Sequence, residues 1–127
     1  MANPNIVAVT AIYANTSTLL ISSTADPFAT ALVSNAASSG KVYKINSIVA
    51  ANVDGTSAAD ISIKIFSAAA LGGTGTAIAS TISVPPDASL IVTDKTTSFY
   101  LLEDRSIGAT ASAANDIVVT CSWEEIN

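Results

Sequence analysis

Short segments in which apolar and polar residues alternate, separated by turn residues about every ten positions, most constrain how this chain of 127 residues can fold. Successive side chains of a β-strand point to opposite faces, so this pattern is typical of half-buried strands. The β-branched residues Ile, Val and Thr are abundant, whereas Lys, Glu and Arg are scarce and Gln is absent. We predict one all-β domain over residues 1–127, an antiparallel β-sandwich of jelly-roll type with about eight to ten strands.

The segment of residues 41–54 shows the alternation most clearly. Its predicted apolar face carries Tyr43, Ile45, Val49, Ala51 and Val53, with Ile48 as the exception. Asp54-Gly55 is typical of a tight turn because Gly tolerates positive φ. Alternation restarts at Ile61, Ile63 and Ile65, so we predict that these two segments pair as a β-hairpin.

The remaining segments predict further strands at residues 6–13, 18–22, 28–34, 78–84, 90–93, 98–102, 107–111 and 117–123. Asp26 and Pro27 interrupt the pattern, and the two prolines before Asp87 end another strand because proline cannot donate to a ladder. Polar residues 94–97 and 103–105 are predicted corners. The predicted core consists of Ile45, Val49, Ile61, Ile63, Ile65, Ile82, Leu101, Ile107, Ile117, Val119 and Trp123.

The chain has few residues suited to catalysis, since His is absent and Cys121 is the single cysteine. Nucleophiles, tuned acids and bases, and metal ligands come mostly from His, Cys and paired carboxylates. Cys121 lies between Val119 and Trp123 on a predicted apolar face, which favours a buried, inert thiol over a reactive one. We expect a non-enzymatic protein with no catalytic residue, no cofactor and no metal.

Acidic residues give two candidate sites. Asp54, Asp60 and Asp116 have the oxygen ligands that Ca²⁺ prefers, but no loop shows the dense spacing of a calcium-binding loop, and turn acids are the alternative. Glu103 and Asp104 are neighbours at a strand end, where adjacent side chains point apart, unlike the facing carboxylates of a glycosidase. We interpret both sets as structural.

Two further motifs have structural alternatives. The glycine-rich residues 71–76 partly match a phosphate-binding loop, but the Gly-Lys-Ser/Thr ending and the following helix are missing, so we predict a surface loop. Asn15-Thr16-Ser17 matches a glycosylation triplet. The first residues lack the basic region and apolar core of a signal peptide, so we expect no export and interpret the triplet as a turn.

The formal net charge is −5, and the five basic residues are scattered along the chain, not clustered. Nucleic-acid binding requires a basic patch, so neither nucleic acid nor an anionic membrane is an expected partner. The longest apolar runs are too short to span a membrane, which predicts a soluble chain. Only 12% of the residues are charged, so we expect part of the surface to be buried against neighbouring subunits.

Five segments carry a resemblance to known proteins: residues 40–55 (GKVYKINSIVAANVDG), 58–65 (AADISIKI), 82–85 (ISVP), 99–104 (FYLLED) and 121–126 (CSWEEI). With them, residues 30–126 resemble small structural proteins of tailed bacteriophages, including phages of marine bacteria and cyanobacteria. The resemblance implies a β-sandwich in a virion. The segment near residues 100–104 usually reads leucine, acid, Gly, Asp in such proteins; this chain lacks the Gly, so we expect a differently built turn.

Three function classes remain open. The first class, which the resemblance favours, is a capsid decoration (cement) protein, a homo-oligomer bound to the major capsid protein or other virion proteins. A neck, tail or fibre component is the alternative, and a carbohydrate-binding module, which needs exposed aromatic side chains, is the third. Residues 1–22 carry no charged side chain and would form an aggregation-prone edge if left unpaired. We therefore expect this N-terminal segment to make subunit contacts.

Overall fold

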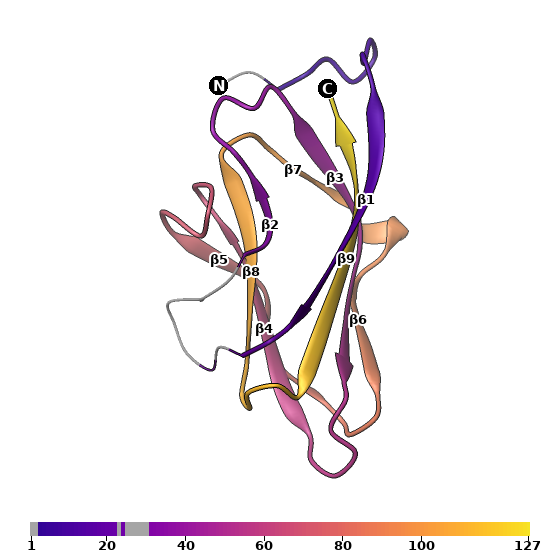
Figure 1. The fold of residues 1–127 in the computed structure, drawn as a ribbon, viewed down its shortest axis with the longest axis vertical. Coiled ribbons are helices and arrows are strands. Elements are labelled where there is room, and N and C mark those ends of the chain that lie inside the picture. Colours follow the sequence, from indigo (N-terminus) through magenta and orange to yellow (C-terminus); the bar gives the residue numbers. More distant parts are fainter. Residues whose placement is uncertain (1–2, 23, 25–30) are drawn as a thin grey trace.

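The computed structural model describes residues 3–22, 24 and 31–127, which form two antiparallel sheets packed face to face (Figure 1). One sheet contains, in order, β1 (Ile12–Leu20), β9 (Ile117–Ile126), β3 (Val42–Asn52) and β6 (Ser89–Thr93), with β7 (Phe99–Leu101) also paired to β3. The other sheet has the order β2 (Ala31–Asn35), β8 (Arg105–Ala111), β4 (Ala59–Phe66) and β5 (Gly75–Val84). The predicted antiparallel β-sandwich is confirmed.

The polar stretch between β6 and β7 forms the short 3₁₀ helix η1 (Lys95–Thr97). The Asp94 side chain caps this turn by accepting a hydrogen bond from the backbone N–H of Thr96 at 3.0 Å. The corner predicted at residues 94–97 is therefore confirmed. Within the described part of the chain, no helix is long and apolar enough to cross a membrane.

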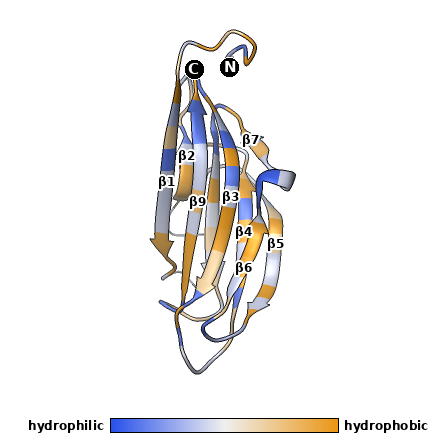
Figure 2. Cartoon of the chain, turned by 90° about the vertical axis from the view of Figure 1, so that its right-hand side faces the viewer, coloured by the Kyte–Doolittle hydropathy of each residue, from blue (hydrophilic) through white to orange (hydrophobic). Residues whose placement is uncertain are grey.

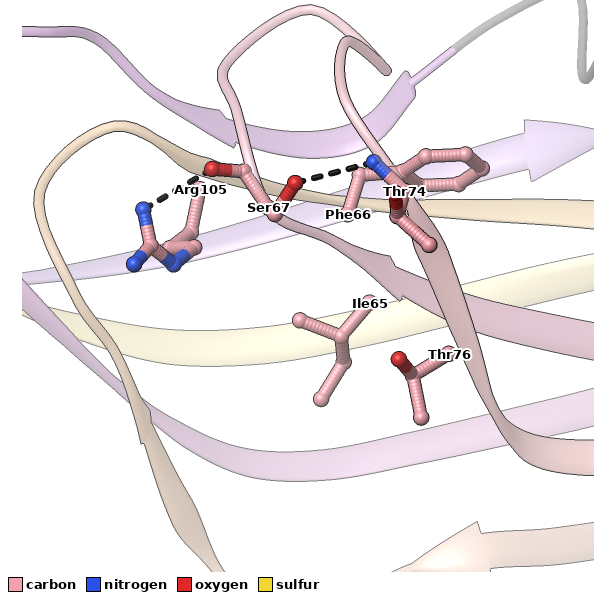
Figure 3. Close-up of a pocket in the computed structure, with 6 residues that line it drawn as sticks. All are labelled: Ile65, Phe66, Ser67, Thr74, Thr76 and Arg105. Atoms are coloured by element: carbon pink, nitrogen blue, oxygen red, sulfur yellow. Dashed lines mark hydrogen bonds between the residues drawn. The ribbon is translucent and has the colours of Figure 1, made fainter.

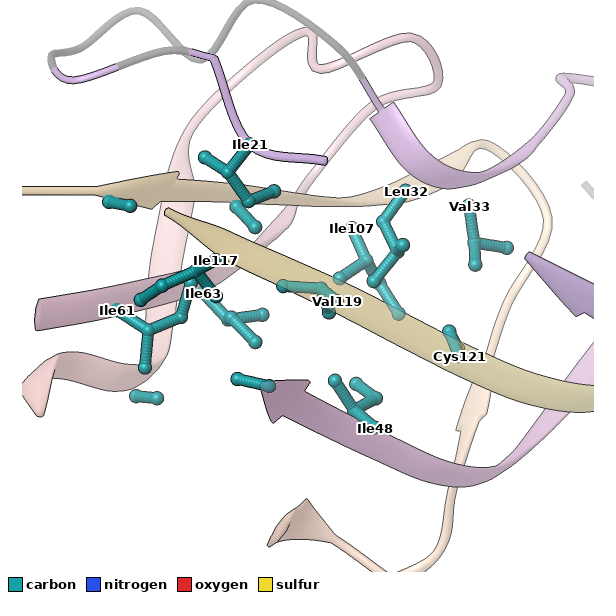
Figure 4. Packing of buried hydrophobic residues seen from close by; sticks show 14 of the residues in the cluster. Ile21, Leu32, Val33, Ile48, Ile61, Ile63, Ile107, Ile117, Val119 and Cys121 are labelled. Atoms are coloured by element: carbon teal, nitrogen blue, oxygen red, sulfur yellow. The ribbon is translucent and has the colours of Figure 1, made fainter. Parts of the chain in front are cut away.

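The space between the sheets is filled mainly by β-branched side chains (Figure 4). Seven residues of the predicted core are fully buried: Ile45, Ile61, Ile63, Leu101, Ile107, Ile117 and Val119. Ile65 and Trp123 are partly buried and pack against this cluster. The structure adds eight large buried side chains that are not in the predicted core: Ile21, Leu32, Val33, Val42, Ile48, Phe66, Val84 and Ile126.

A β-bulge in β3 inverts the predicted faces of the part of the strand that follows it. Ile45 lies opposite Trp123 of β9, but the next aligned residue of β3 is Ser47, opposite Ser122. The extra residue, Asn46, moves every later side chain to the other face. Ile48 and Ala50 are therefore buried, and the prediction of Val49, Ala51 and Val53 as the inner face is wrong; Val53 is 56% exposed.

A similar irregularity corrects the prediction for β5. Its register with β4 shifts on both sides of Ile63, and Thr81 adopts a left-handed φ of 46°. Ala79 and Val84 face the core, whereas Ile82 is 40% exposed. The prediction of Ile82 as a core residue is wrong because these shifts break the strict alternation on which it depended.

The hairpin predicted at Asp54-Gly55 is also wrong, because β3 and β4 belong to different sheets. Side chains, not a strand ladder, hold this connection. The Asp54 carboxylate accepts the backbone N–H of Thr56 at 2.9 Å, and the buried Asn52 amide donates to the carbonyls of Ser57 and Val84, both at 2.9 Å. These bonds satisfy backbone groups of the β3–β4 loop and of the end of β5.

The N-terminal region forms one strand where two were predicted. The triplet interpreted as a turn lies inside β1, with Asn15 opposite Trp123 and Ser17 opposite Cys121, and residues 6–8 form a turn and bend instead of a strand. Pairing with the long strand β9 outweighs the local turn preference. The strand predicted at residues 28–34 is observed as β2; residues 28–30, and the interruption predicted at Asp26 and Pro27, lie outside the described residues.

Candidate interaction surface

Strand β1 forms one edge of the five-stranded sheet, and its hydrogen-bonding directions follow from its two ends. At one end, Ala11 and Asn127 exchange both backbone hydrogen bonds; at the other, Ile21 N–H donates to the Ile117 carbonyl at 2.9 Å. In an antiparallel ladder, residue pairs that exchange two backbone hydrogen bonds alternate with pairs that exchange none. The backbone N–H and C=O groups of the odd-numbered residues of β1 therefore point toward β9. The even-numbered residues direct their N–H and C=O groups away from it: Ile12, Ala14, Thr16, Thr18 and Leu20.

This edge has no strand beside it within the described residues, because β1 ends the strand order. The sequence of β1 itself lacks the residues that usually protect an exposed edge. Over its nine residues it has no charged residue, no proline and no glycine, and its register with β9 is unbroken. A long, regular, uncharged edge is a template for pairing with another chain.

The outer face of the same sheet continues this uncharged character. Because Ile48 and Ala50 point inward, Val49 and Ala51 point outward. In cross-strand rows, Leu20 lies beside Val118 and Ala51, and Thr18 lies beside Thr120, Val49 and Ile91. We call these seven residues the uncharged patch; Leu20 is 47% and Ile91 63% exposed. Figure 2 shows hydrophobic colours at the lower ends of β1, β9 and β3.

Charged and aromatic groups gather at the other end of this sheet. Lys41 and Glu125 form a salt bridge, which raises the pKa of the Lys41 ammonium. Tyr43 stacks on Trp123 with ring centroids 6.0 Å apart, and burial, followed by the charge of Glu125, raises the pKa of the Tyr43 phenol. Tyr43 and Trp123 pack against the core, so their faces do not form the open platform that a carbohydrate-binding module needs.

The three candidate acidic residues lie on different elements of the fold. Asp54 accepts hydrogen bonds from Thr56, which lower the pKa of its carboxyl group. Asp60 lies on β4, and Asp116 lies in the turn before β9, where its carbonyl accepts the N–H of Val53. Among the described residues, no three His, Cys, Asp or Glu side chains gather as a metal site would require.

Glu103 and Asp104 point to different loops, as predicted for adjacent residues. Glu103 is buried, and its carboxylate accepts the N–H of Gly40 at 2.6 Å, which ties the β7–β8 turn to the β2–β3 loop. Asp104 accepts the N–H of Ala69 at 3.0 Å and adopts a φ of 57°. An aspartate therefore takes up the left-handed conformation that glycine adopts without strain.

Residues 71–74 of the glycine-rich segment belong to the loop between β4 and β5, beside a shallow hollow of about 270 Å³ (Figure 3). The N–H groups of residues 67–72 and of Thr74 all donate within the chain, to backbone or side-chain oxygens. Arg105, which lines the hollow, donates to the carbonyls of Ser67 and Asp104. This loop therefore presents none of these N–H groups to a phosphate. The predicted loop is confirmed for residues 71–74, whereas Gly75 and Thr76 begin β5 and pair with Phe66 and Ile65 of β4.

Cys121 is fully buried in the core, as predicted. Burial raises the pKa of its thiol to about 12. The thiolate, which is the reactive form of cysteine, is therefore scarce near neutral pH.

Comparison with known proteins finds no matching family model and no matching curated protein. Among the described residues, the strongest candidate for a binding surface is the free edge of β1 with the uncharged patch beside it. The sequence predicts that residues 1–22 make subunit contacts. The structure narrows the relevant groups to the alternate residues from Ile12 to Leu20, which only the register with β9 reveals.

Proposed function

We propose that this protein is a non-enzymatic structural subunit of a tailed-phage virion, and that it decorates the capsid as a cement protein. The observation that carries the proposal is the unprotected edge of β1, nine residues long and without charge. A free monomer would leave this pairing template open to solvent. In a particle, a neighbouring subunit covers it.

The strand order supports this proposal. If β6 and β7 are taken as two halves of one strand along β3, the pairs β1–β9, β2–β8, β3–β6/β7 and β4–β5 are nested like a long hairpin folded over on itself. We infer a jelly-roll topology, which occurs in viral capsid domains and also in lectins and cupins. Because proteins with this fold have several different functions, we infer the function from the contact surface and not from the fold.

The distribution of charge favours a protein surface as the partner. The uncharged patch and the β1 edge lie side by side, so neighbouring subunits of a particle can cover both without burying an unpaired charge. The Lys41–Glu125 pair lies at the other end of the sheet and stays in solvent in this arrangement. We propose the major capsid protein, or another virion protein, as the partner.

Imaging of particles tests the proposal. Tailed-phage particles that encode this protein are purified, labelled with a gold-conjugated antibody against it, and viewed by electron microscopy. A regular array of label over the shell is the expected result. Label confined to the neck, tail or fibres would overturn the cement role and assign the alternative position, and particles without label would overturn the virion assignment.

Point variants on the edge connect the imaging to the proposed contact. Thr16→Lys places a charge on the free edge without removing any β1–β9 backbone hydrogen bond, because the backbone of Thr16 faces away from β9; it removes only the side-chain contact with the Ser122 hydroxyl. Ala114→Lys adds the same charge in the exposed β8–β9 turn and serves as the matched control. Thr16→Lys should lower the number of copies per particle, and Ala114→Lys should not. Equal occupancy of the two variants would place the contact elsewhere.

A further inference from the structure

We propose that two copies of this protein pair edge to edge through β1, antiparallel, about a two-fold axis at Thr16. The pairing rests on the proposed function, because it names the partner of the β1 edge as a second copy of the chain. The two five-stranded sheets then form one continuous sheet across the dimer. Main-chain hydrogen bonds supply the attraction, as in other cases of strand addition.

The backbone geometry of β1 permits this pairing. The five even-numbered residues face the free edge, and Thr16 lies at the midpoint between Ile12 and Leu20. In the proposed register, Ile12 lies opposite Leu20 of the partner subunit and Ala14 lies opposite Thr18 of the partner subunit. All five even-numbered residues then form hydrogen-bonded pairs with the partner subunit, and each pair exchanges two backbone hydrogen bonds, about ten in total.

The limits of the free edge favour this register. Before Ile12, the N–H groups of Thr10 and Ala11 donate to the Asn127 carbonyl. After Leu20, the Ile21 carbonyl accepts the N–H of Asn115 in the β8–β9 turn, and the Ile21 side chain is buried. A register centred one or two residues earlier or later keeps the same hydrogen-bonding directions but leaves one end of the strand unpaired. An axis at Thr16 uses the whole edge.

The side chains are compatible in the same register. Ile12 and Leu20 bring two exposed apolar side chains together, while Ala14 meets the small Thr18. The Thr16 hydroxyl already lies 3.4 Å from the Ser122 hydroxyl on β9, and Thr16 of the partner subunit extends this row. Threonine pairs and apolar pairs both stabilise adjacent strands. No charge enters the contact, although each copy carries a formal net charge of −5.

Site-specific crosslinking of the purified full chain tests the register. A short bis-maleimide joins cysteines introduced on the outer face of β1. Thr16→Cys should crosslink with the same cysteine of the partner subunit, because the Cα atoms of a hydrogen-bonded pair lie about 5.5 Å apart. Ala14→Cys alone and Thr18→Cys alone should not crosslink, since each cysteine lies about 14 Å along the strand from the same cysteine of the partner subunit. A mixture of the two should crosslink, and the wild type is the control for the buried Cys121.

Sedimentation equilibrium measures the strength of the dimer. Thr16→Lys places two ammonium groups opposite each other at the axis, so its dimer dissociation constant should rise by about fivefold or more, while that of Ala114→Lys should not change. A monomer at millimolar concentration, or equal crosslinking of all three single variants, would overturn the pairing.

The two proposals fail separately. A monomeric protein that still labels the shell would leave the virion assignment intact and show that a shell protein covers the edge. A dimer in the Thr16 register that no particle contains would support the pairing and remove the virion assignment.

Discussion

The β-bulge at Asn46 predicts opposite effects for two neighbouring residues. Ile48 is completely buried, between Cys121 on β9 and Thr93 on β6. Its replacement by alanine removes three buried carbon atoms and leaves a cavity, which typically costs about 2–5 kcal/mol. Val49 lies on the outer face, so Val49→Ala should cost less than about 1 kcal/mol.

The expected shift in melting temperature is large enough to measure. An unfolding entropy of about 2.1 cal/mol/K per residue gives about 0.27 kcal/mol/K for this chain. A loss of about 3 kcal/mol in Ile48→Ala therefore lowers Tm by about 11 °C. Val49→Ala should lower it by less than about 4 °C.

Thermal and urea unfolding of both variants would check this difference. The single tryptophan, Trp123, stacks on Tyr43 and provides a fluorescence signal for loss of the fold. The urea m-value should stay constant, because neither variant changes the surface exposed on unfolding by much. If Val49→Ala proved as costly as Ile48→Ala, or more so, the bulge would be absent and the strict alternation of the sequence would describe β3 correctly.

Three other predictions concern the turns and the core. Asp104→Gly should cost less stability than Asp104→Ala, because both lose the bond to Ala69 but only glycine relieves the left-handed φ of 57°; equal losses in thermal unfolding would contradict this. Cys121 should not react with a thiol reagent at pH 8 in the folded protein, since burial raises its pKa to about 12, and rapid labelling of native protein would refute it. The folded-state pKa values of Asp54 and Asp94 are lowered by hydrogen bonds from Thr56 and Thr96, so their contribution to stability is present above the unfolded pKa of about 3.9 and is lost as the pH falls through the folded values. Asp54→Asn combined with Asp94→Asn should therefore flatten the acid limb of stability against pH, and an unchanged limb would show that other carboxylates cause it.

Local patterns were sufficient to predict the fold class and most strands. Alternation and β-branched residues favour a pleated conformation wherever they occur, so β3, β4, β6, β8 and β9 were located from the sequence. The buried position of Cys121 followed in the same way, because the alternation of β9 has no bulge between Ile117 and Cys121. These features depend on residues close together in the chain.

Pairing between distant segments determined the rest. Asn46 becomes a bulge only because β9 continues in register on both sides of it, and Asn15-Thr16-Ser17 becomes strand because β9 offers it partners more than 100 residues away. The candidate surface shows the same division. The uncharged composition of residues 12–20 is visible in the sequence, but which N–H and C=O groups remain free depends on which residues bond to β9. A one-residue change of register would direct the other set of backbone groups to the edge, so only the tertiary structure decides which residues are available for pairing.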